Sequence, residues 1–458
     1  MAPKFGTSGL RGLVTELTPE LVDAHVAAFL HARASGSGLF VGHDLRESSP
    51  RIAENVIAAG RAQAVAVTDC GAVPTPALAL AAMAAGAAAV MVTGSHIPAD
   101  RNGLKFYTPA GEITKAQETA ILAALGGASG SSTPGVLAQA DPGPAFLARY
   151  RDAFGAGALT GRRVGVWSHS AVGRDLLIDT LVALGAEVVE IGRSDAFIPV
   201  DTEAVGPDSR ALLTAAAAQH RLDAIASTDG DGDRPLLTDG NGRVIPGDVL
   251  GQITARMLGA DVVVTPVSSN TGVDDLGFGQ VIRTRIGSPH VIAGMETALA
   301  RDPSARVVGY EANGGFLLGF EAALQAGRLP ALMTRDSHLP IIAPLVAAGK
   351  AGLGALVAAQ PPRFTAADRL TDVPTEASAT LVGQLTADPA DFLSDLGAGE
   401  LAATDTTDGL RLTLASGRIV HLRPSGNAPE LRLYAEAENP EAAEALLSAG
   451  LALLRARV

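Results

Sequence analysis

A short apolar run, followed by a polar turn and then a helical pattern, occurs three times along the chain. The apolar runs cover residues 39–42, 164–167 and 262–264, and the polar turns after them cover residues 43–50, 168–173 and 266–271. This order is typical of α/β units in which buried parallel strands alternate with helices. Ligands bind such sheets beyond the carboxyl ends of the strands, where these polar turns lie. Because the three stretches share few residue identities, the pattern predicts a common topology only.

The chain is long enough to hold several such units. Its 458 residues exceed what one hydrophobic core supports, and an apolar fraction of 47% can fill several interiors. Gly-, Ser- and Pro-rich residues 126–144 and the Gln-Pro-Pro segment 360–362 predict linkers. The segment after the second linker alternates as a strand at residues 410–414 and ends in an alanine- and leucine-rich helix. It therefore predicts a separate α+β domain.

Charge and cysteine content restrict the partners and the compartment. With a net charge of −13, the chain is a poor ligand for the phosphate backbone of nucleic acids. Cys70 is the single cysteine, so no intrachain disulfide forms and a reducing cytoplasm is expected. The most apolar stretch, residues 77–92, contains a glycine and is short for a bilayer span, and no signal peptide is recognisable. We expect a cytoplasmic protein without a membrane or nucleic-acid partner.

The first candidate loop carries a serine directly after a predicted buried strand. Residues 93–98 read Thr-Gly-Ser-His-Ile-Pro, and residues 102–105 follow as Asn-Gly-Leu-Lys. The Gly-x-Ser-x-Gly elbow of hydrolases is excluded because Thr93 and Ile97 stand at its glycine positions. Two interpretations of Ser95 stay open at this point: a reactive hydroxyl at a strand end, or an ordinary surface turn.

The second candidate loop, residues 229–234, reads Asp-Gly-Asp-Gly-Asp-Arg. Alternating carboxylates with glycines between them can curl around one hard cation. An EF-hand is excluded, because Arg234 occupies the position of its invariant glycine and Gly240 that of its bidentate glutamate. A solvated acidic turn is the plainer alternative, but three close carboxylates repel one another without a compensating cation. Metal binding is therefore the favoured hypothesis, and open coordination positions suit Mg²⁺ shared with a phosphate oxygen.

Two further loops contain residues suited to sugars and phosphates. Residues 309–315 read Gly-Tyr-Glu-Ala-Asn-Gly-Gly, in which Glu311 and Asn313 could bind paired hydroxyl groups. Residues 423–432 read Arg-Pro-Ser-Gly-Asn-Ala-Pro-Glu-Leu-Arg, and two arginines, a hydroxyl and a glycine describe a phosphate cradle. Each loop has a plain alternative, an acidic glycine-rich turn for the first and a hairpin turn with surface arginines for the second.

In this order and spacing, the four loops resemble those of the α-D-phosphohexomutase family. The resemblance extends over essentially the whole chain and begins at residues 5–12, Phe-Gly-Thr-Ser-Gly-Leu-Arg-Gly. It implies an α/β fold of three topologically similar α/β domains with mixed and parallel sheets, a C-terminal α+β domain, and an active site in a central cleft. The implied domains are residues 1–143 with the phosphoserine loop, 144–246 with the metal loop, 247–362 with the sugar loop and 363–458 with the phosphate loop.

The resemblance also implies a role for each candidate residue. Ser95 would be the phosphoserine, and one of its phosphate oxygens would bind Mg²⁺ together with Asp229, Asp231 and Asp233. Lys105 would be a general acid or base, with Arg11 and His96 beside it. The substrate-binding residues implied are Arg46, Arg234, Arg285, Glu311, Asn313, Arg423, Ser425, Gly426, Asn427 and Arg432.

The implied reaction passes a phosphoryl group from phospho-Ser95 to a hexose phosphate and takes the other phosphate back. A hexose 1,6-bisphosphate is the intermediate and the activator, Mg²⁺ is the metal, and the protein is a monomer or homodimer. The loop combination, including residues 284–289, most resembles bacterial members that interconvert mannose 6-phosphate and mannose 1-phosphate. Glucose phosphates, alone or as a second pair, and then glucosamine phosphates are the alternatives. A sugar phosphatase and a non-catalytic sugar-phosphate binder are more remote ones.

The chain departs from the common family pattern at three places. Ile97 replaces an asparagine, the sugar loop reads Glu-Ala-Asn-Gly-Gly instead of Glu-x-Ser-Gly, and residues 427–428 read Asn-Ala instead of Thr-Glu. None of these changes removes a charge needed for the metal or the phosphate, so the reaction class is unaffected. They bear instead on which sugar is bound.

Overall fold

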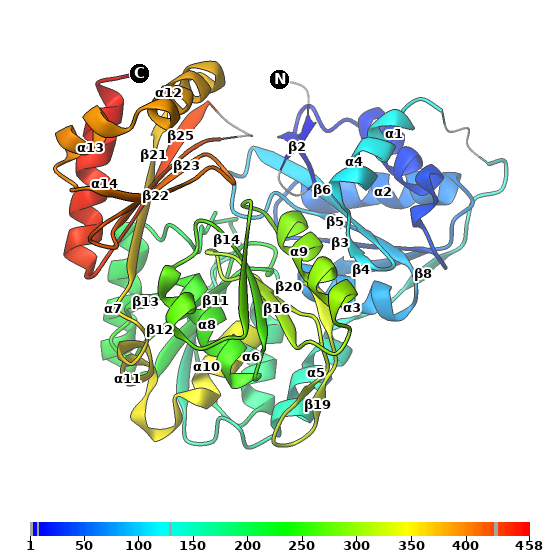
Figure 1. Cartoon of the computed structure of the whole chain (residues 1–458). Helices are drawn as coiled ribbons and strands as arrows, with labels where there is room; N and C mark the ends of the chain where they lie inside the picture. Colours follow the sequence, from blue (N-terminus) through cyan, green and yellow to red (C-terminus); the bar gives the residue numbers. More distant parts are fainter. Residues whose placement is uncertain (1–2, 7–8, 128–130, 426–428) are drawn as a thin grey trace.

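Four sheets dominate the computed structural model, which describes residues 3–6, 9–127, 131–425 and 429–458 (Figure 1). One sheet has eight strands and the other three have five strands each. We call the segments that carry these sheets the first (4–139), second (163–245), third (262–336) and fourth (364–437) units. The runs predicted from the sequence at 39–42, 164–167 and 262–264 are the first parallel strand of each of the first three units.

The first unit places helices on both faces of its sheet (Figure 1). Its strands are β1 (Lys4–Phe5), β2 (Leu10–Leu13), β3 (Leu39–His43), β4 (Val67–Ala72), β5 (Ala88–Val92), β6 (Arg101–Thr108), β7 (Gly111–Glu112) and β8 (Leu137–Gln139). Its helices are α1 (Pro19–Phe29), continued by a π-turn (Leu30–Ala34), α2 (Ser49–Ala62), α3 (Thr75–Ala84) and α4 (Lys115–Ala123). Strand β5 is buried along its whole length, as expected for a parallel strand covered on both sides.

The second and third units are smaller and follow one another directly. The second contains β9 (Arg163–Trp167), α6 (Arg174–Ala183), β10 (Glu187–Ile191), α7 (Pro207–His220), β11 (Ala224–Thr228), β12 (Pro235–Thr238) and β13 (Val244–Ile245), preceded by α5 (Gly143–Phe154). The third contains β14 (Val262–Pro266), a 3₁₀ turn (Thr271–Asp275), β15 (Gln280–Thr284), α9 (Ser288–Arg301), β16 (Val307–Tyr310), β17 (Phe316–Leu318), the hairpin β18 (Ala322–Ala323) and β19 (Arg328–Leu329), and β20 (Leu332–Asp336). Helix α8 (Gly247–Met257) precedes the third sheet, and α10 (Leu339–Ala347), a 3₁₀ turn (Gly349–Ala351) and α11 (Leu353–Ala358) follow it.

The first three sheets share one strand topology. Their central strands run in the orders β4-β3-β5-β6, β10-β9-β11-β12 and β15-β14-β16-β17. In each order the first two pairs are parallel and the third pair is antiparallel. The predicted fold of three similar α/β units is therefore confirmed.

Each of the first three candidate loops occupies the same place in this topology. Residues 93–100 join β5 to β6, residues 229–234 join β11 to β12, and residues 311–315 join β16 to β17. Each loop thus connects the third strand of its unit to the antiparallel strand that follows. In the first two units the polar turn after the first strand, where the sequence pattern placed the ligand, contacts the candidate loop. Arg46 Nη2 donates to the Ser95 carbonyl at 2.8 Å, and the Val172 N–H donates to the Gly230 carbonyl at 3.0 Å.

The fourth unit has an antiparallel sheet of the order β21-β25-β24-β23-β22. Its elements are β21 (Phe364–Thr371), α12 (Thr375–Ala387), α13 (Ala390–Leu396), β22 (Leu401–Asp405), β23 (Leu410–Leu414), β24 (Ile419–Pro424), β25 (Glu430–Ala437) and α14 (Pro440–Arg455). This is the predicted α+β arrangement. Among the helices that the structure describes, none has the length and hydropathy needed to cross a membrane.

The hydrophobic cores divide the molecule differently from the sheets. One large cluster of buried apolar side chains runs through the first three units and includes Leu78, Phe146 and Leu250. Each of these units also has a further cluster of its own, whereas the cluster of the fourth unit, which includes Leu412 and Leu433, joins none of the others. The first three units therefore pack as one body, against which the fourth unit is a separate folding element.

Candidate active site

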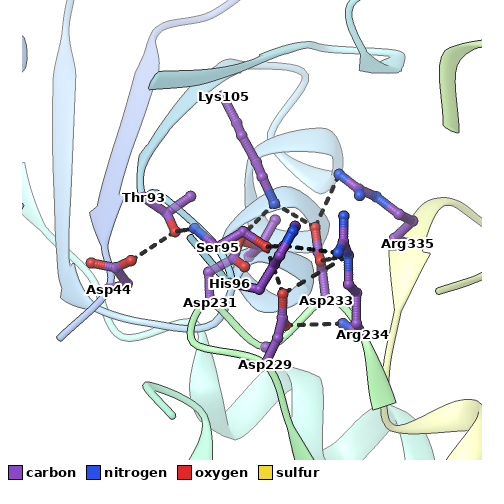
Figure 2. A network of polar contacts seen from close by, with 12 residues as sticks. Asp44, Thr93, Ser95, His96, Lys105, Asp229, Asp231, Asp233, Arg234 and Arg335 are labelled. Carbon is purple, nitrogen blue, oxygen red and sulfur yellow. Dashed lines mark hydrogen bonds and ion pairs between the residues drawn. The ribbon is translucent and has the colours of Figure 1, made fainter. Parts of the chain in front are cut away.

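Ser95 lies at the end of the buried strand β5 and is itself only 1% exposed (Figure 2). Its backbone has a φ of 55°, in the left-handed region that residues with a Cβ rarely adopt. Its N–H donates to Thr93 Oγ1 at 2.7 Å, and its side-chain hydroxyl donates to Asp229 Oδ2 at 2.6 Å. The serine of the first unit is thus hydrogen-bonded to the acidic loop of the second.

The three aspartates of that loop are fully buried, and one carboxylate oxygen of each lies within 4.8 Å of those of the other two. Lys105 Nζ, from β6, donates to Asp231 Oδ2 at 2.5 Å and to Asp233 Oδ2 at 2.6 Å (Figure 2). Asp231 Oδ1 and Asp233 Oδ1 have no hydrogen-bond partner in the described part of the chain. Unpaired buried carboxylate oxygens are costly, so this donor set fits a hard divalent cation.

Burial and charge move the pKa values of these carboxyl groups in opposite directions. Burial, with Asp231 and Asp233 nearby, raises the pKa of Asp229 well above its ordinary value. Burial also acts to raise the pKa of Asp231, but the charge and hydrogen bond of Lys105, the hydrogen bond of Thr75 and the charge of Arg335 together outweigh it and lower that pKa. A cation among the three groups would favour the charged form of all of them.

Cationic and neutral nitrogen groups surround the serine. Arg234 Nη1 donates to His96 Nδ1 at 2.8 Å, which fixes that nitrogen as an acceptor (Figure 2). Burial and the Arg234 charge lower the pKa of His96 well below its usual range, so its imidazole is neutral. Arg11, on β2, experiences the charges of Arg234, Asp231 and Asp233, and burial followed by Arg234 lowers its pKa to about 10. The structure therefore brings together Ser95, Lys105, Arg11, His96, Arg234 and the three aspartates.

The sugar loop of the third unit approaches this group. Glu311 is buried, and burial raises its pKa while the charges of Arg335 and Arg234 lower it. Its Oε2 has no hydrogen-bond partner among the described residues, so this oxygen can accept from a ligand hydroxyl. The carbonyl of Asn313 accepts from Thr202 Oγ1 at 3.0 Å, which ties the loop to the second unit.

The predicted phosphate loop lies in the fourth unit. Ser425 is buried and its N–H donates to the Glu430 carbonyl at 2.9 Å, whereas Arg423 and Arg432 are half-buried. Arg423 Nε is 2.9 Å from Asp408 Oδ2, and Arg432 Nη2 is 3.4 Å from Glu430 Oε2. Gly426 and Asn427, also predicted to bind phosphate, lie outside the described residues.

Two predicted substrate-binding arginines have other contacts in the structure. Arg285 is exposed, and its Nε donates to the carbonyl of Thr407 in the fourth unit at 3.0 Å. Arg46 is buried, and its guanidinium donates to carbonyl groups of the loop that carries Ser95, at 2.8 Å for Ser95 itself. Substrate binding by these two residues stays a prediction.

The sequence reasoning missed Arg335 and Glu112, which reach the metal loop from other units. Arg335, on β20, lies 3.0 Å from Asp233 Oδ2 through Nη2 and 3.2 Å from Glu112 Oε1 through Nε (Figure 2). Glu112, on β7, also accepts from Ser288 Oγ at 2.7 Å. Neither residue belongs to a recognisable motif, and only the packing of β7 of the first unit against β20 of the third brings them together.

Comparison with known proteins identifies the family. Residues 2–129 match the family model described as "Phosphoglucomutase/phosphomannomutase, alpha/beta/alpha domain I". Residues 373–452 match the model of the C-terminal domain of the same family. A phosphomannomutase from Sinorhizobium fredii is 46% identical over 99% of this chain and 99% of its own. A phosphomannomutase from Salmonella muenchen is 42% identical over 95% of this chain and 92% of its own. The chain belongs to the phosphoglucomutase/phosphomannomutase family.

The fold of the whole chain has counterparts among solved structures. A phosphoglucomutase/phosphomannomutase family protein from Burkholderia thailandensis superposes with a TM-score of 0.77. The match covers 98% of this chain and 97% of the other, at 22% sequence identity. At that identity the likeness concerns the fold, including the order of the four units.

Proposed function

We propose that this protein is a phosphomannomutase, which interconverts mannose 6-phosphate and mannose 1-phosphate through a phosphorylated Ser95. The observation that carries the reaction class is the 2.6 Å hydrogen bond between the Ser95 hydroxyl and Asp229, inside the buried triad of aspartates. The choice of mannose rests on the two phosphomannomutases that are 46% and 42% identical along nearly the whole chain.

Two transfers make up the proposed reaction. In the first, a hydroxyl oxygen of the hexose phosphate bonds to the phosphorus of phospho-Ser95 while the bond from phosphorus to Oγ breaks. The hydroxyl proton passes to a base and the departing Oγ takes up a proton from an acid, so the products are a hexose 1,6-bisphosphate and free Ser95. The bisphosphate then turns end for end, and Ser95 takes the other phosphate by the reverse chemistry.

The residues around Ser95 suit these steps. Mg²⁺ held by Asp229, Asp231 and Asp233 would offset the charge of the phosphoryl group. Lys105 is an ammonium donor between two carboxylates, and His96 is neutral, so an acid and a base lie within one group. Glu311 and Asn313 would bind sugar hydroxyls, and Arg423, Ser425, Gly426, Asn427 and Arg432 would hold the phosphate that is not reacting.

The proposal includes the organisation of the protein. Boundaries after residues 143, 246 and 362 would separate four domains, and the separate core of the fourth unit supports the last of these boundaries. A central cleft between the domains, a monomeric or homodimeric state and a cytoplasmic location stay predictions from the sequence.

A panel of mannose, glucose and glucosamine 1-phosphates, assayed with Mg²⁺ and hexose 1,6-bisphosphate, tests the proposal. Mannose 1-phosphate should have the highest kcat/KM. If mannose 1-phosphate turns over slowest of the three, the mannose assignment is wrong. Release of inorganic phosphate without formation of the isomer would instead identify a sugar phosphatase.

A further inference from the structure

The Arg46 side chain packs against the loop that carries Ser95. It is 1% exposed, although an arginine side chain ordinarily stays in contact with water. Its two terminal nitrogens donate to four backbone carbonyls of that loop and of its return strand: Ser95 at 2.8 Å, Ile97 at 2.6 Å, Pro98 at 2.7 Å and Arg101 at 3.1 Å. The hydrogen bonds of the guanidinium thus hold the backbone of the loop in one conformation.

Asp44 connects Arg46 to the backbone N–H of Ser95 through Thr93. Its Oδ2 accepts from Arg46 Nε at 3.2 Å and from Thr93 Oγ1 at 2.7 Å. Thr93 Oγ1 in turn accepts from the N–H of Ser95 at 2.7 Å (Figure 2). The Asp44–Arg46 pair therefore holds both backbone polar groups of Ser95, its N–H through Thr93 and its carbonyl directly.

The backbone of Ser95 needs such support. Its φ of 55° is sparsely populated by residues with a side chain, and a conformation of this kind persists only where its surroundings over-determine it. The left-handed turn directs the Ser95 hydroxyl to Asp229 in the second unit. If the loop relaxed, the hydroxyl would leave the acidic triad.

The space around the Arg46 guanidinium is closed on two sides. The ring of Phe197, from the second unit, lies 4.0 Å from the guanidinium carbon in a cation–π contact. A Cβ added to Gly94 would lie 2.7 Å from the same carbon, and one added to Gly230 would lie 2.9 Å from the Ser95 carbonyl oxygen. A side chain at Gly94 would therefore press on the guanidinium, and one at Gly230 would press on the Ser95 carbonyl to which the guanidinium donates.

We propose that Arg46 is a positioning residue, which holds phospho-Ser95 in line with the metal loop and does not itself bind the substrate. This inference rests on the proposed function, because it concerns the serine that transfers the phosphoryl group. It changes the role predicted for Arg46 from the sequence, since the hydrogen bonds of the guanidinium are directed to the backbone of the loop. Asp44 of the first unit and Phe197 of the second unit hold the Arg46 side chain in place.

Arg46→Lys is the main test, because lysine keeps the charge but cannot reach four carbonyls and a carboxylate from one planar group. We expect kcat to fall by about 10- to 100-fold, the scale of a misplaced reactive group, with KM for the hexose phosphate nearly unchanged. A loosely held phosphoserine should also lose its phosphoryl group to water faster. The half-life of phospho-Ser95 without sugar, measured by intact-protein mass spectrometry, should shorten.

Arg149→Met is the matched control. Arg149 is a second buried arginine that donates to a carbonyl, that of Pro330 at 2.5 Å, and lies against the ring of Tyr150 away from the serine loop. This variant should lose thermal stability and keep the kcat and the phosphoserine half-life of the unmodified protein.

Gly94→Ala and Phe197→Leu provide a second route if Arg46→Lys fails to fold. The alanine methyl displaces the guanidinium and the leucine removes the cation–π contact, and neither variant changes a charge. Both should lower kcat and shorten the phosphoserine half-life, Gly94→Ala more than Phe197→Leu.

Unchanged kcat and half-life in Arg46→Lys, or a raised KM with unchanged kcat, would overturn the positioning role. Failure of the unmodified protein to accept a phosphoryl group on Ser95 from hexose 1,6-bisphosphate would instead contradict the proposed function. The half-life is measured without sugar, so it tests the positioning role whichever hexose phosphate is the substrate.

Discussion

The serine–metal region and the phosphate loop of the fourth unit are built in different ways. Ser95 and the three aspartates are buried, and their hydrogen bonds come from the first, second and third units, which share one core. Arg423 and Arg432 are half-buried and belong to a unit with a core of its own. Polar contacts such as that of the Thr271 N–H with Glu436 Oε2, 3.1 Å long, connect this unit to the third.

The proposed reaction explains why the two regions differ. The serine has to present its phosphoryl group to the metal loop in one geometry in both transfers. The phosphate loop has to hold the 1-phosphate in one transfer and the 6-phosphate in the other, with the sugar turned round. The reaction therefore needs a rigidly held phosphoserine and a phosphate loop that can bind two different phosphates. Substitutions in the two regions should have different kinetic effects.

The largest effect is expected for Ser95→Ala, which removes the group that carries the phosphoryl. Turnover should fall on the order of 10⁴-fold or more, because the covalent step has no substitute. Binding of the hexose phosphate, measured by calorimetric titration, should stay within a few-fold. A turnover rate like that of the unmodified protein would refute the assignment of Ser95.

Asp231→Asn should have the next largest effect. Loss of one negative charge from the triad should slow transfer by about 10²-fold and raise the Mg²⁺ concentration needed for half-maximal rate. Titration of the rate with Mg²⁺, and binding of Mn²⁺ followed by electron paramagnetic resonance, measure both changes. Asp239→Asn is the control, because Asp239 is a buried aspartate of the second unit that accepts from the N–H of Asn241 and lies outside the triad. An unchanged metal titration in Asp231→Asn would count against the metal site.

Arg432→Met should affect binding more than chemistry. Loss of one charged hydrogen-bond donor should raise KM for the hexose phosphate by about 10-fold, with a much smaller change in kcat. Arg418→Met, which breaks an exposed ion pair with Glu438 in the same unit, should leave both constants unchanged. If Arg432→Met lowers kcat as strongly as Asp231→Asn does, the contrast between the two regions is wrong.

Leu412→Ala and Leu250→Ala compare the two cores. Each substitution leaves a cavity in a buried cluster and should lower the free energy of unfolding by about 3 kcal/mol. In differential scanning calorimetry, Leu412→Ala should lower only the transition of the fourth unit, and Leu250→Ala only that of the other three. A single transition that shifts equally in both variants would show that the four units unfold together.

Acid should destabilise the body formed by the first three units. Burial lowers the pKa of His169 to about 4 and that of His338 to about 3. Histidines in the unfolded chain titrate near pH ~6.5, so below that pH the unfolded state binds more protons. Each histidine should then reduce the free energy of unfolding by about 1.4 kcal/mol per pH unit, down to its folded pKa. Urea titrations at several pH values should show this loss, and it should be weaker in the His169→Gln, His338→Gln double variant.

Much of the fold could be predicted because strands buried on both faces leave a plain signal. The apolar runs at residues 39–42, 164–167 and 262–264 are β3, β9 and β14. They predict that three units of the chain are alike, although few residues are identical. The sequence did not indicate that the candidate loops follow the third strand of each unit, because strand order within a sheet depends on long-range pairing.

The candidate site could be predicted where adjacent residues form a motif. The triad at residues 229–233 and the serine at 95 lie in contact, and each is recognisable from a few neighbouring letters. Arg335 and Glu112 come from two separate strands and were not predicted. Arg46 was predicted as a site residue, but whether its donors meet substrate or backbone depends on burial, which a single sequence does not show.

The equivalent placement of the three loops has a consequence for redesign. Each loop begins and ends on the corresponding pair of neighbouring strands in its unit, so the ends of an exchanged loop meet the same strands, and contacts outside the unit, such as that of Thr202 with the Asn313 carbonyl, have to be kept. Replacing residues 311–315 with the corresponding segment of a relative that acts on another sugar would graft a new selectivity while the nucleophile and the metal ligands remain. Of the three equivalent loops, the sugar loop is therefore the one in which we expect substitutions to be tolerated, because the other two carry the nucleophile and the metal ligands.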